Sequence, residues 1–132
     1  MPKDSILVVD DEPEVLDTTR WALEMAGFEV HTAASAEEAL PRARAVKPQV
    51  LLIDYKLPRM NGLEFLQAVR TWIPNVVAIM ITGLTHQTDR LEEESRRLGA
   101  VRFLHKPLEI ERVIQTVKGL IRPSTGSGRT GD

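Results

Sequence analysis

Three carboxylates and one ammonium stand where short apolar runs of this sequence end. The four residues are Asp10, Asp11, Asp54 and Lys106, and the runs before them are residues 6–9, 50–53 and 101–105. If these runs are parallel strands, the side chains meet at the carboxyl edge of one sheet, where open α/β sheets bind ligands. Acidic groups gathered there repel one another unless a cation is present. Because Mg²⁺ takes oxygen ligands and keeps several waters, we predict a magnesium site open to solvent.

A further apolar run, residues 76–81, stops at Thr82 and Gly83. This run and the one before Asp54 are apolar throughout, which is typical of central strands buried on both faces. Residues 28–32 alternate between apolar and polar side chains, as a half-exposed strand does. Because the strand-like segments alternate with helical patterns, the sequence predicts an α/β fold: a five-stranded parallel sheet with helices on both faces.

Five helices are expected. The first covers about residues 13–26, and the second follows Ser35, with Glu38 completing a capping box. Pro41 removes one backbone donor from the second helix, so we expect a kink or a late, short helix there. The others are expected from Asn61, over residues 88–98, and along the apolar stripe of residues 110–121.

Composition narrows the class of protein. The 132 residues carry a formal net charge of −2 and no cysteine, which gives no basic footprint for nucleic acid and excludes thiol chemistry. No apolar run approaches the roughly 20 residues of a membrane-spanning helix. Residues 1–122 fit one domain, and residues 123–132 are predicted to be a flexible tail or the start of a linker. We expect a cytoplasmic protein that binds neither nucleic acid nor membrane directly.

The pattern resembles the receiver domain of two-component response regulators over residues 4–121. The resemblance rests on the strand-end residues named above, on Pro107 after Lys106, and on three residues of the loop after Asp54, namely Pro58, Asn61 and Gly62. It implies a flavodoxin-like sheet with strand order 2-1-3-4-5. It also implies that the chain accepts a phosphoryl group and then changes partners, without being an enzyme beyond catalysing its own phosphorylation and dephosphorylation.

The resemblance implies a role for each site residue. Asp54 receives the phosphoryl group from a histidine kinase or a histidine phosphotransfer protein. The ligands of Mg²⁺ (or Mn²⁺) are implied to be Asp11, Asp54, the backbone carbonyl of Lys56 and, directly or through water, Asp10. The phosphoryl oxygens are implied to contact Thr82, Gly83 and Lys106, and the Lys106–Pro107 peptide bond is implied to be cis.

The resemblance also implies a switch, and two departures from the family pattern, at Lys56 and Leu84, bear on its rate. Thr82 and Phe103 occupy the switch positions, and they act on a partner face formed by the fourth helix, fifth strand and fifth helix. An unknown output domain or target protein is expected at this face. Lys56 beside the metal site and Leu84 near the path of the attacking water predict slow self-dephosphorylation.

Each feature also has a purely structural interpretation. Asp10 and Asp11 could cap a helix, Asp54 could be a turn residue, and Thr82 with Gly83 could form a turn at a strand end. Lys106 could be a solvated lysine, and the side chains of Lys56 and Leu84 could simply point to solvent. Phe103 could be an ordinary core aromatic.

Two other functions remain open. One is a pseudo-receiver that docks without phosphorylation, against which the complete set of acids, threonine and lysine argues. The other is a flavodoxin-like FMN carrier, whose phosphate would be repelled by Asp10, Asp11 and Glu12 after the first strand.

Overall fold

The computed structural model describes residues 4–83, 93, 94, 96, 97 and 100–121. Its strands are β1 (Ser5–Val9), β2 (Glu29–Ala33), β3 (Val50–Asp54), β4 (Val77–Thr82) and β5 (Ala100–His105). They form one parallel sheet in the order β2-β1-β3-β4-β5. The helices are α1 (Pro13–Met25), α2 (Ala36–Val46), α3 (Gly62–Arg70) and α5 (Ile110–Ile121). The predicted α/β sheet is confirmed, and so is the strand order that the resemblance implied.

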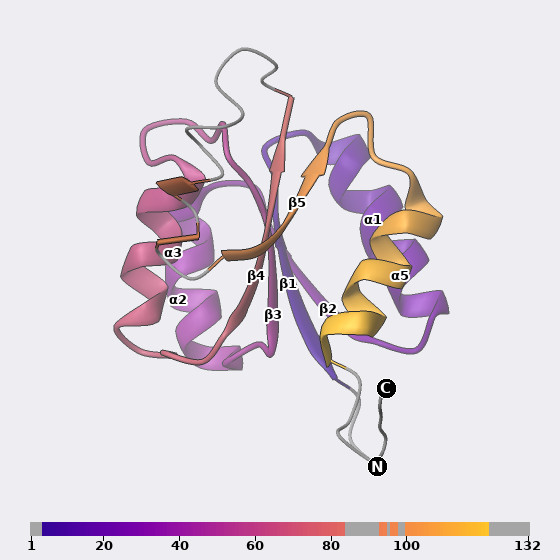
Figure 1. The fold of residues 1–132 in the computed structure, drawn as a ribbon, viewed down its shortest axis with the longest axis horizontal. Coiled ribbons are helices and arrows are strands. Elements are labelled where there is room, and N and C mark those ends of the chain that lie inside the picture. Colours follow the sequence, from indigo (N-terminus) through magenta and orange to yellow (C-terminus); the bar gives the residue numbers. More distant parts are fainter. Residues whose placement is uncertain (1–3, 84–92, 95, 98–99, 122–132) are drawn as a thin grey trace.

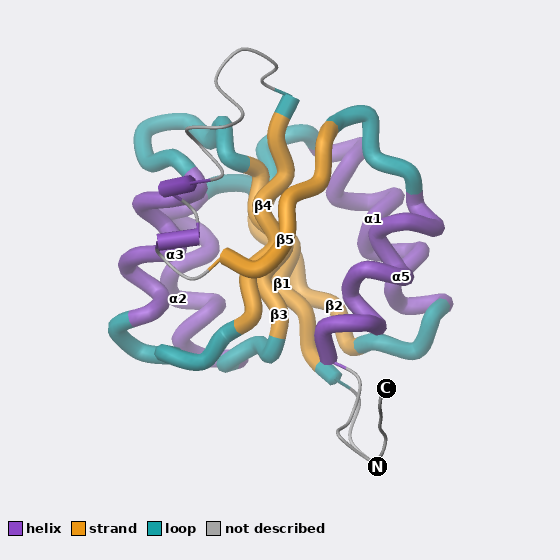
Figure 2. Tube along the Cα trace, viewed as in Figure 1, coloured by secondary structure: helices purple, strands orange, loops and turns teal. Residues whose placement is uncertain are grey.

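Helices cover both faces of the sheet. Figure 1 shows α2 and α3 on one face and α1 and α5 on the other, and Figure 2 shows the strands between these two layers. In β3, Leu51 and Ile53 pack in the core under α2 and α3, while Val50 and Leu52 pack in the core under α1 and α5. Every residue of β3 is therefore buried, as predicted for a central strand. Burial of each such side chain contributes roughly 1.5–3 kcal/mol.

Capping residues fix the start of two helices. Asn61 accepts a hydrogen bond from the Glu64 amide, and the Glu64 carboxylate accepts one from the Asn61 amide, both over 2.9 Å. This reciprocal box begins α3 at the end of the loop that follows Asp54. At α2, Ser35 accepts from the Glu38 amide as predicted. The Glu38 carboxylate accepts instead from the amide of Ala34, one residue before the expected donor.

The expectation of a late, short helix around Pro41 is wrong. Helix α2 begins directly after Ser35 and runs for 11 residues through Pro41 to Val46. Pro41 lies on the exposed side of the helix. The carbonyl of Glu37, which loses its usual amide partner to the proline ring, is therefore on a side where water can hydrate it.

Two predicted segments lie largely or wholly outside the described residues. Of the helix expected over residues 88–98, the structure describes Glu93, Glu94, Arg96 and Arg97, which are helical and exposed. The tail or linker expected over residues 123–132 is outside the described part of the chain.

Candidate functional site

The register of the sheet aligns four strand ends at its carboxyl edge. Paired residues are Val9 with Ile53, Asp54 with Ile81, and Thr82 with His105. Asp10 follows β1, Asp54 and Thr82 are the last residues of β3 and β4, and Lys106 follows β5. Residues that are far apart in the sequence therefore lie on neighbouring strands at one edge.

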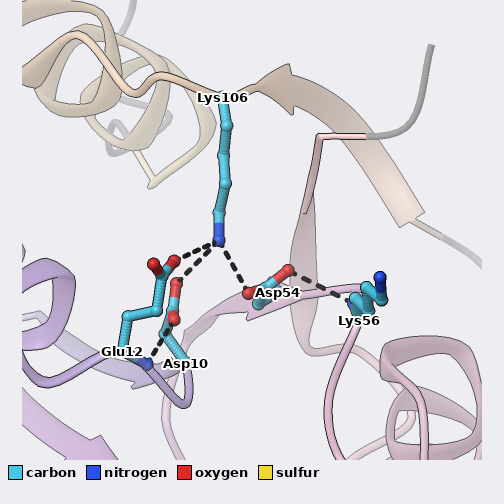
Figure 3. Close-up of polar contacts among 5 residues, drawn as sticks. All are labelled: Asp10, Glu12, Asp54, Lys56 and Lys106. Atoms are coloured by element: carbon cyan, nitrogen blue, oxygen red, sulfur yellow. Dashed lines mark hydrogen bonds and ion pairs between the residues drawn. The ribbon is translucent and has the colours of Figure 1, made fainter.

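Lys106 is the centre of a cluster of charges at this edge. Its Nζ lies 2.8 Å from Glu12 Oε1, 2.9 Å from Asp54 Oδ2 and 3.7 Å from Asp10 Oδ2. Figure 3 shows the lysine side chain extending toward the three acids from the segment after β5. Burial lowers the pKa of Lys106, but the hydrogen bonds to Glu12 and Asp54 and the charges of Asp54 and Asp10 outweigh it. The net effect raises the pKa above its ordinary value, so the lysine remains a cation.

Asp10 is the most deeply buried acid of the cluster. Its side chain is 1% exposed, its Oδ1 accepts a hydrogen bond from the Glu12 amide, and its Oδ2 is buried without a hydrogen-bond partner. Burial raises the pKa of Asp10 from 3.8 to about 6; the Glu12 amide opposes this increase, and the neighbouring charge of Asp54 adds to it. Asp10 Oδ2 therefore accepts no hydrogen bond and has Lys106 Nζ at 3.7 Å, so it remains able to serve as a ligand atom.

Asp54 is held by the loop that follows it. Its Oδ1 accepts a hydrogen bond from the Lys56 amide over 3.2 Å, and its side chain is almost wholly buried. The loop closes where the Gly62 amide donates to the Tyr55 carbonyl. A Cβ on Gly62 would lie 2.8 Å from Met80 Sδ and 2.9 Å from the Asp54 carbonyl, so α3 can approach this closely only because residue 62 is glycine.

The other predicted phosphate contacts lie at the same edge. Thr82 is 1% exposed, and its carbonyl accepts a hydrogen bond from the Lys106 amide over 3.0 Å. Gly83 is exposed, and a Cβ there would meet the Lys106 side chain at ordinary contact distance. The Lys106–Pro107 peptide bond is cis, as the resemblance implied.

Asp11 and Lys56 line the mouth of the site. Both are exposed, and both line a hollow of about 610 Å³ that also reaches Asp54 and Lys106. The Asp11 carboxylate is not part of the closely spaced acidic cluster, in which Asp10, Asp54 and Glu12 each contribute an oxygen within 4.8 Å of the others.

Phe103 lies further from the charges. It is partly buried and packs against the core on the α2–α3 side of the sheet. It also lines a small cavity of about 140 Å³ between β5 and α5. The other predicted rate-tuning residue, Leu84, lies outside the described residues.

Glu12 is the site residue that the sequence reasoning missed as a member of the cluster. In the sequence, Glu12 stands out only as one of three negative charges after the first strand. Its backbone is extended, with φ −96° and ψ 113°. The chain bends at Asp11, and the Glu12 amide donates to Asp10 Oδ1. The two carboxylates are thus brought together by a local turn, for which the residue spacing gives no signal.

The residues present fit a hard divalent cation. The donor set consists of carboxylate oxygens, one of them buried without a hydrogen bond, beside a hollow open to solvent. Oxygen ligands with room for several waters are what Mg²⁺ requires.

Comparison with known proteins identifies the family. The family model for the response regulator receiver domain matches residues 6–118. The chain therefore belongs to the response regulator receiver family. A solved structure of chemotaxis protein CheY4 from Vibrio cholerae has a TM-score of 0.83 and 30% identity, covering 90% of this chain and 99% of that one. A CheY-like receiver domain from Methanospirillum hungatei JF-1 has a TM-score of 0.82 and 32% identity, covering 89% and 93%.

Curated relatives are longer than this chain. The alkaline phosphatase synthesis transcriptional regulatory protein PhoP of Bacillus subtilis is 33% identical over 119 residues, covering 90% of this chain and 49% of PhoP. The transcriptional regulatory protein KdpE of Mycobacterium tuberculosis is 30% identical over 122 residues, covering 92% and 53%. The chain thus spans about half the length of these relatives. Among the described residues, no helix is long and apolar enough to span a bilayer.

Proposed function

We propose that this receiver domain accepts a phosphoryl group on Asp54 from a histidine kinase or a histidine phosphotransfer protein. The observation that carries the proposal is the position of Asp54, whose two carboxylate oxygens are held by Lys106 Nζ and by the Lys56 amide. A carboxylate fixed in this way is aimed at the open hollow beside it. Family membership supports the same function.

The transfer exchanges one bond to phosphorus for another. A carboxylate oxygen of Asp54 forms the new P–O bond, the P–N bond to the donor imidazole breaks, and the electron pair stays on the departing nitrogen, which takes up a proton. Such a step needs little covalent help and depends on neutralising charge on the transferred oxygens. Lys106, the Thr82 hydroxyl and the Gly83 amide would supply this neutralisation.

We propose Mg²⁺, or Mn²⁺ in its place, as the cation of the site. Asp10, Asp11, Asp54 and the Lys56 carbonyl would hold it. The cation would offset the negative charge that accumulates when a phosphoryl group approaches the acids.

A groove beside Lys106 gives the donor access to the site. It measures about 590 Å³, and its mostly apolar walls include Val15 of α1 together with Pro107, Leu108 and Ile110 near the start of α5. An apolar groove open to solvent next to the acceptor suits the helix that carries a phosphohistidine.

Phosphorylation would then change the partner face. Thr82 and Phe103 are the proposed switch residues, and the ring of Phe103 is only partly buried, on the α2–α3 side of the sheet. The proposed output is a further domain or a separate target protein at the face of the fourth helix, β5 and α5. Lys56 and Leu84 are proposed to slow the loss of the phosphoryl group, and the cytoplasm is the proposed location.

Phosphorylation by a small donor tests this function. Protein incubated with acetyl phosphate and Mg²⁺ should gain the mass of one phosphoryl group, and EDTA should prevent the gain. Asp54→Asn should abolish it, whereas Asp17→Asn, an exposed position on α1, should leave it unchanged. A folded wild-type protein that gains no mass would instead indicate a docking module that works without phosphorylation.

A further inference from the structure

The Glu12 carboxylate accepts a hydrogen bond from Lys106, the ammonium that would hold the phosphoryl group. Its Oε1 lies 2.8 Å from Lys106 Nζ, slightly closer than Asp54 Oδ2 at 2.9 Å. Glu12 is also the residue before α1, yet its side chain caps none of the helix amides. The Glu12 carboxylate therefore contacts Lys106 and does not cap α1.

The two anions compete for the same ammonium. A phosphoryl group attached to Asp54 would bring its oxygens to Lys106 Nζ, from which the Glu12 carboxylate already accepts a hydrogen bond. Two anions on one ammonium also repel each other. We infer that Glu12 is an internal competitor for Lys106, and that its carboxylate turns away when the lysine holds the phosphoryl group.

The contact is well suited to such an exchange. The Glu12 side chain is 58% exposed, whereas that of Asp54 is 4% exposed, so only Glu12 can turn into solvent without reorganising the core. Exposed ion pairs are weak, and breaking one costs little. Glu12 therefore sets how readily the site accepts a phosphoryl group without preventing it.

Beryllofluoride, which mimics a phosphoryl group on aspartate, tests this inference, which rests on the proposed function. Its affinity is measured by calorimetry at saturating Mg²⁺ for the wild type, for Glu12→Gln and for Asp17→Asn, which removes the same charge from an exposed position of α1. Glu12→Gln should bind roughly two- to five-fold more tightly than the wild type, as expected for loss of an exposed ion pair. Asp17→Asn should match the wild type. The difference in affinity between Glu12→Gln and the wild type should become small in 1 M NaCl, where the Debye screening length is about 3 Å.

A second measurement follows the lysine itself. The ¹⁵N resonance of the Lys106 ammonium should change on Glu12→Gln before any beryllofluoride is added, and should remain unchanged on Asp17→Asn. Equal affinities for Glu12→Gln and the wild type, weaker binding by Glu12→Gln, or an equal gain in both variants would overturn the inference while leaving the proposed function intact. If the wild type fails to bind beryllofluoride at all, the proposed function and this inference both fall.

Discussion

Lys106 donates a hydrogen bond from Nζ to Asp54 Oδ2 over 2.9 Å, although 52 residues separate the two in the sequence. Their strands are not neighbours, because β4 lies between β3 and β5. The contact is possible because Lys106 follows β5 directly and its long side chain reaches back across the end of β4. The sheet thus aligns Asp54, the proposed phosphoacceptor, with its counter-charge.

Removing this counter-charge should strengthen the binding of Mg²⁺. Lys106→Met keeps most of the aliphatic chain but leaves Asp10 and Asp54 without their ammonium. Mg²⁺ should then bind more tightly, by roughly three- to ten-fold. The reason is that the lysine cation repels Mg²⁺ with an energy of about 1 kcal/mol or more at an effective dielectric constant near 20. Calorimetry with MgCl₂ measures this. Weaker Mg²⁺ binding by Lys106→Met would contradict the arrangement.

Lys106→Met should also be less stable than the wild type when Mg²⁺ is absent. Breaking a partly buried ion pair leaves uncompensated carboxylates, so the free energy of unfolding in EDTA should fall by about 1–3 kcal/mol. Urea unfolding in EDTA and in Mg²⁺ measures the difference, which Mg²⁺ should largely remove. Lys118→Met, at an exposed position of α5, is the matched control and should change neither value.

Gly62 should not tolerate a side chain. The Cβ of Gly62→Ala would meet the Asp54 carbonyl at 2.9 Å and the Tyr55 Cα at 3.0 Å, and backbone atoms cannot move aside cheaply. The free energy of unfolding should fall by about 1–3 kcal/mol, and Mg²⁺ should bind more weakly because the loop carrying Lys56 shifts. Gly119→Ala meets no atom within 4 Å and should be neutral or stabilising by up to about 1 kcal/mol. Equal effects of the two substitutions in urea unfolding would refute this explanation.

Asp10 should make the stability depend on pH. Burial raises the pKa of Asp10 in the folded chain from 3.8 to about 6, so between these values the folded state binds more protons than the unfolded state. Stability in EDTA should therefore decrease as pH rises through this window. Asp10→Asn should be more stable than the wild type at pH 8, by on the order of 1–3 kcal/mol, and similar to it at pH 4.

Mg²⁺ affinity should show the complementary dependence. Since the ion requires a charged Asp10, binding should weaken as pH falls below about 6.

The control for the pH dependence of stability is Asp11→Asn. Because the Asp11 side chain is exposed, this substitution should alter the free energy of unfolding by less than about 0.5 kcal/mol. A stability gap between Asp10→Asn and the wild type that is the same at pH 4 and pH 8 would show that the Asp10 charge is not its cause.

Phe103 should report activation. Its ring is partly buried against the α2–α3 core. We expect its aromatic ¹H and ¹³C resonances to shift when beryllofluoride and Mg²⁺ are added together, and Thr82→Ala to suppress the shift. Phe65, fully buried in the same core, is the internal reference. Unchanged Phe103 resonances in beryllofluoride-bound protein would remove it from the switch.

The sequence predicted the parts of the site that depend on strand ends. Asp10, Asp54, Thr82 and Lys106 each stand at or just after the end of an apolar run, and a parallel sheet brings such positions together whatever the loop conformations are. The two central strands were also predictable, because residues buried on both faces leave no polar alternation. This part of the argument needs only periodicity and topology.

The other features of the fold and the site depend on backbone conformation, which residue types alone do not determine. Whether Asp11 or Glu12 joins Asp10 in the cluster is decided by how the chain turns between β1 and α1, and the structure places Glu12 there. Pro41 was expected to disrupt its helix, but its effect depends on which side of α2 it occupies. The proximity of Gly62 to Asp54 is a tertiary contact with no local signal.

The most direct test of the central claim is to locate the phosphoryl group. Protein treated with acetyl phosphate and Mg²⁺ is reduced with borohydride, which converts an aspartyl phosphate to homoserine, and its peptides are then sequenced by mass spectrometry. We predict homoserine at position 54 alone, and none when EDTA replaces Mg²⁺. Modification at another aspartate, or at Asp54 without any divalent ion, would contradict the proposal that this cluster is a cation-dependent phosphoacceptor site.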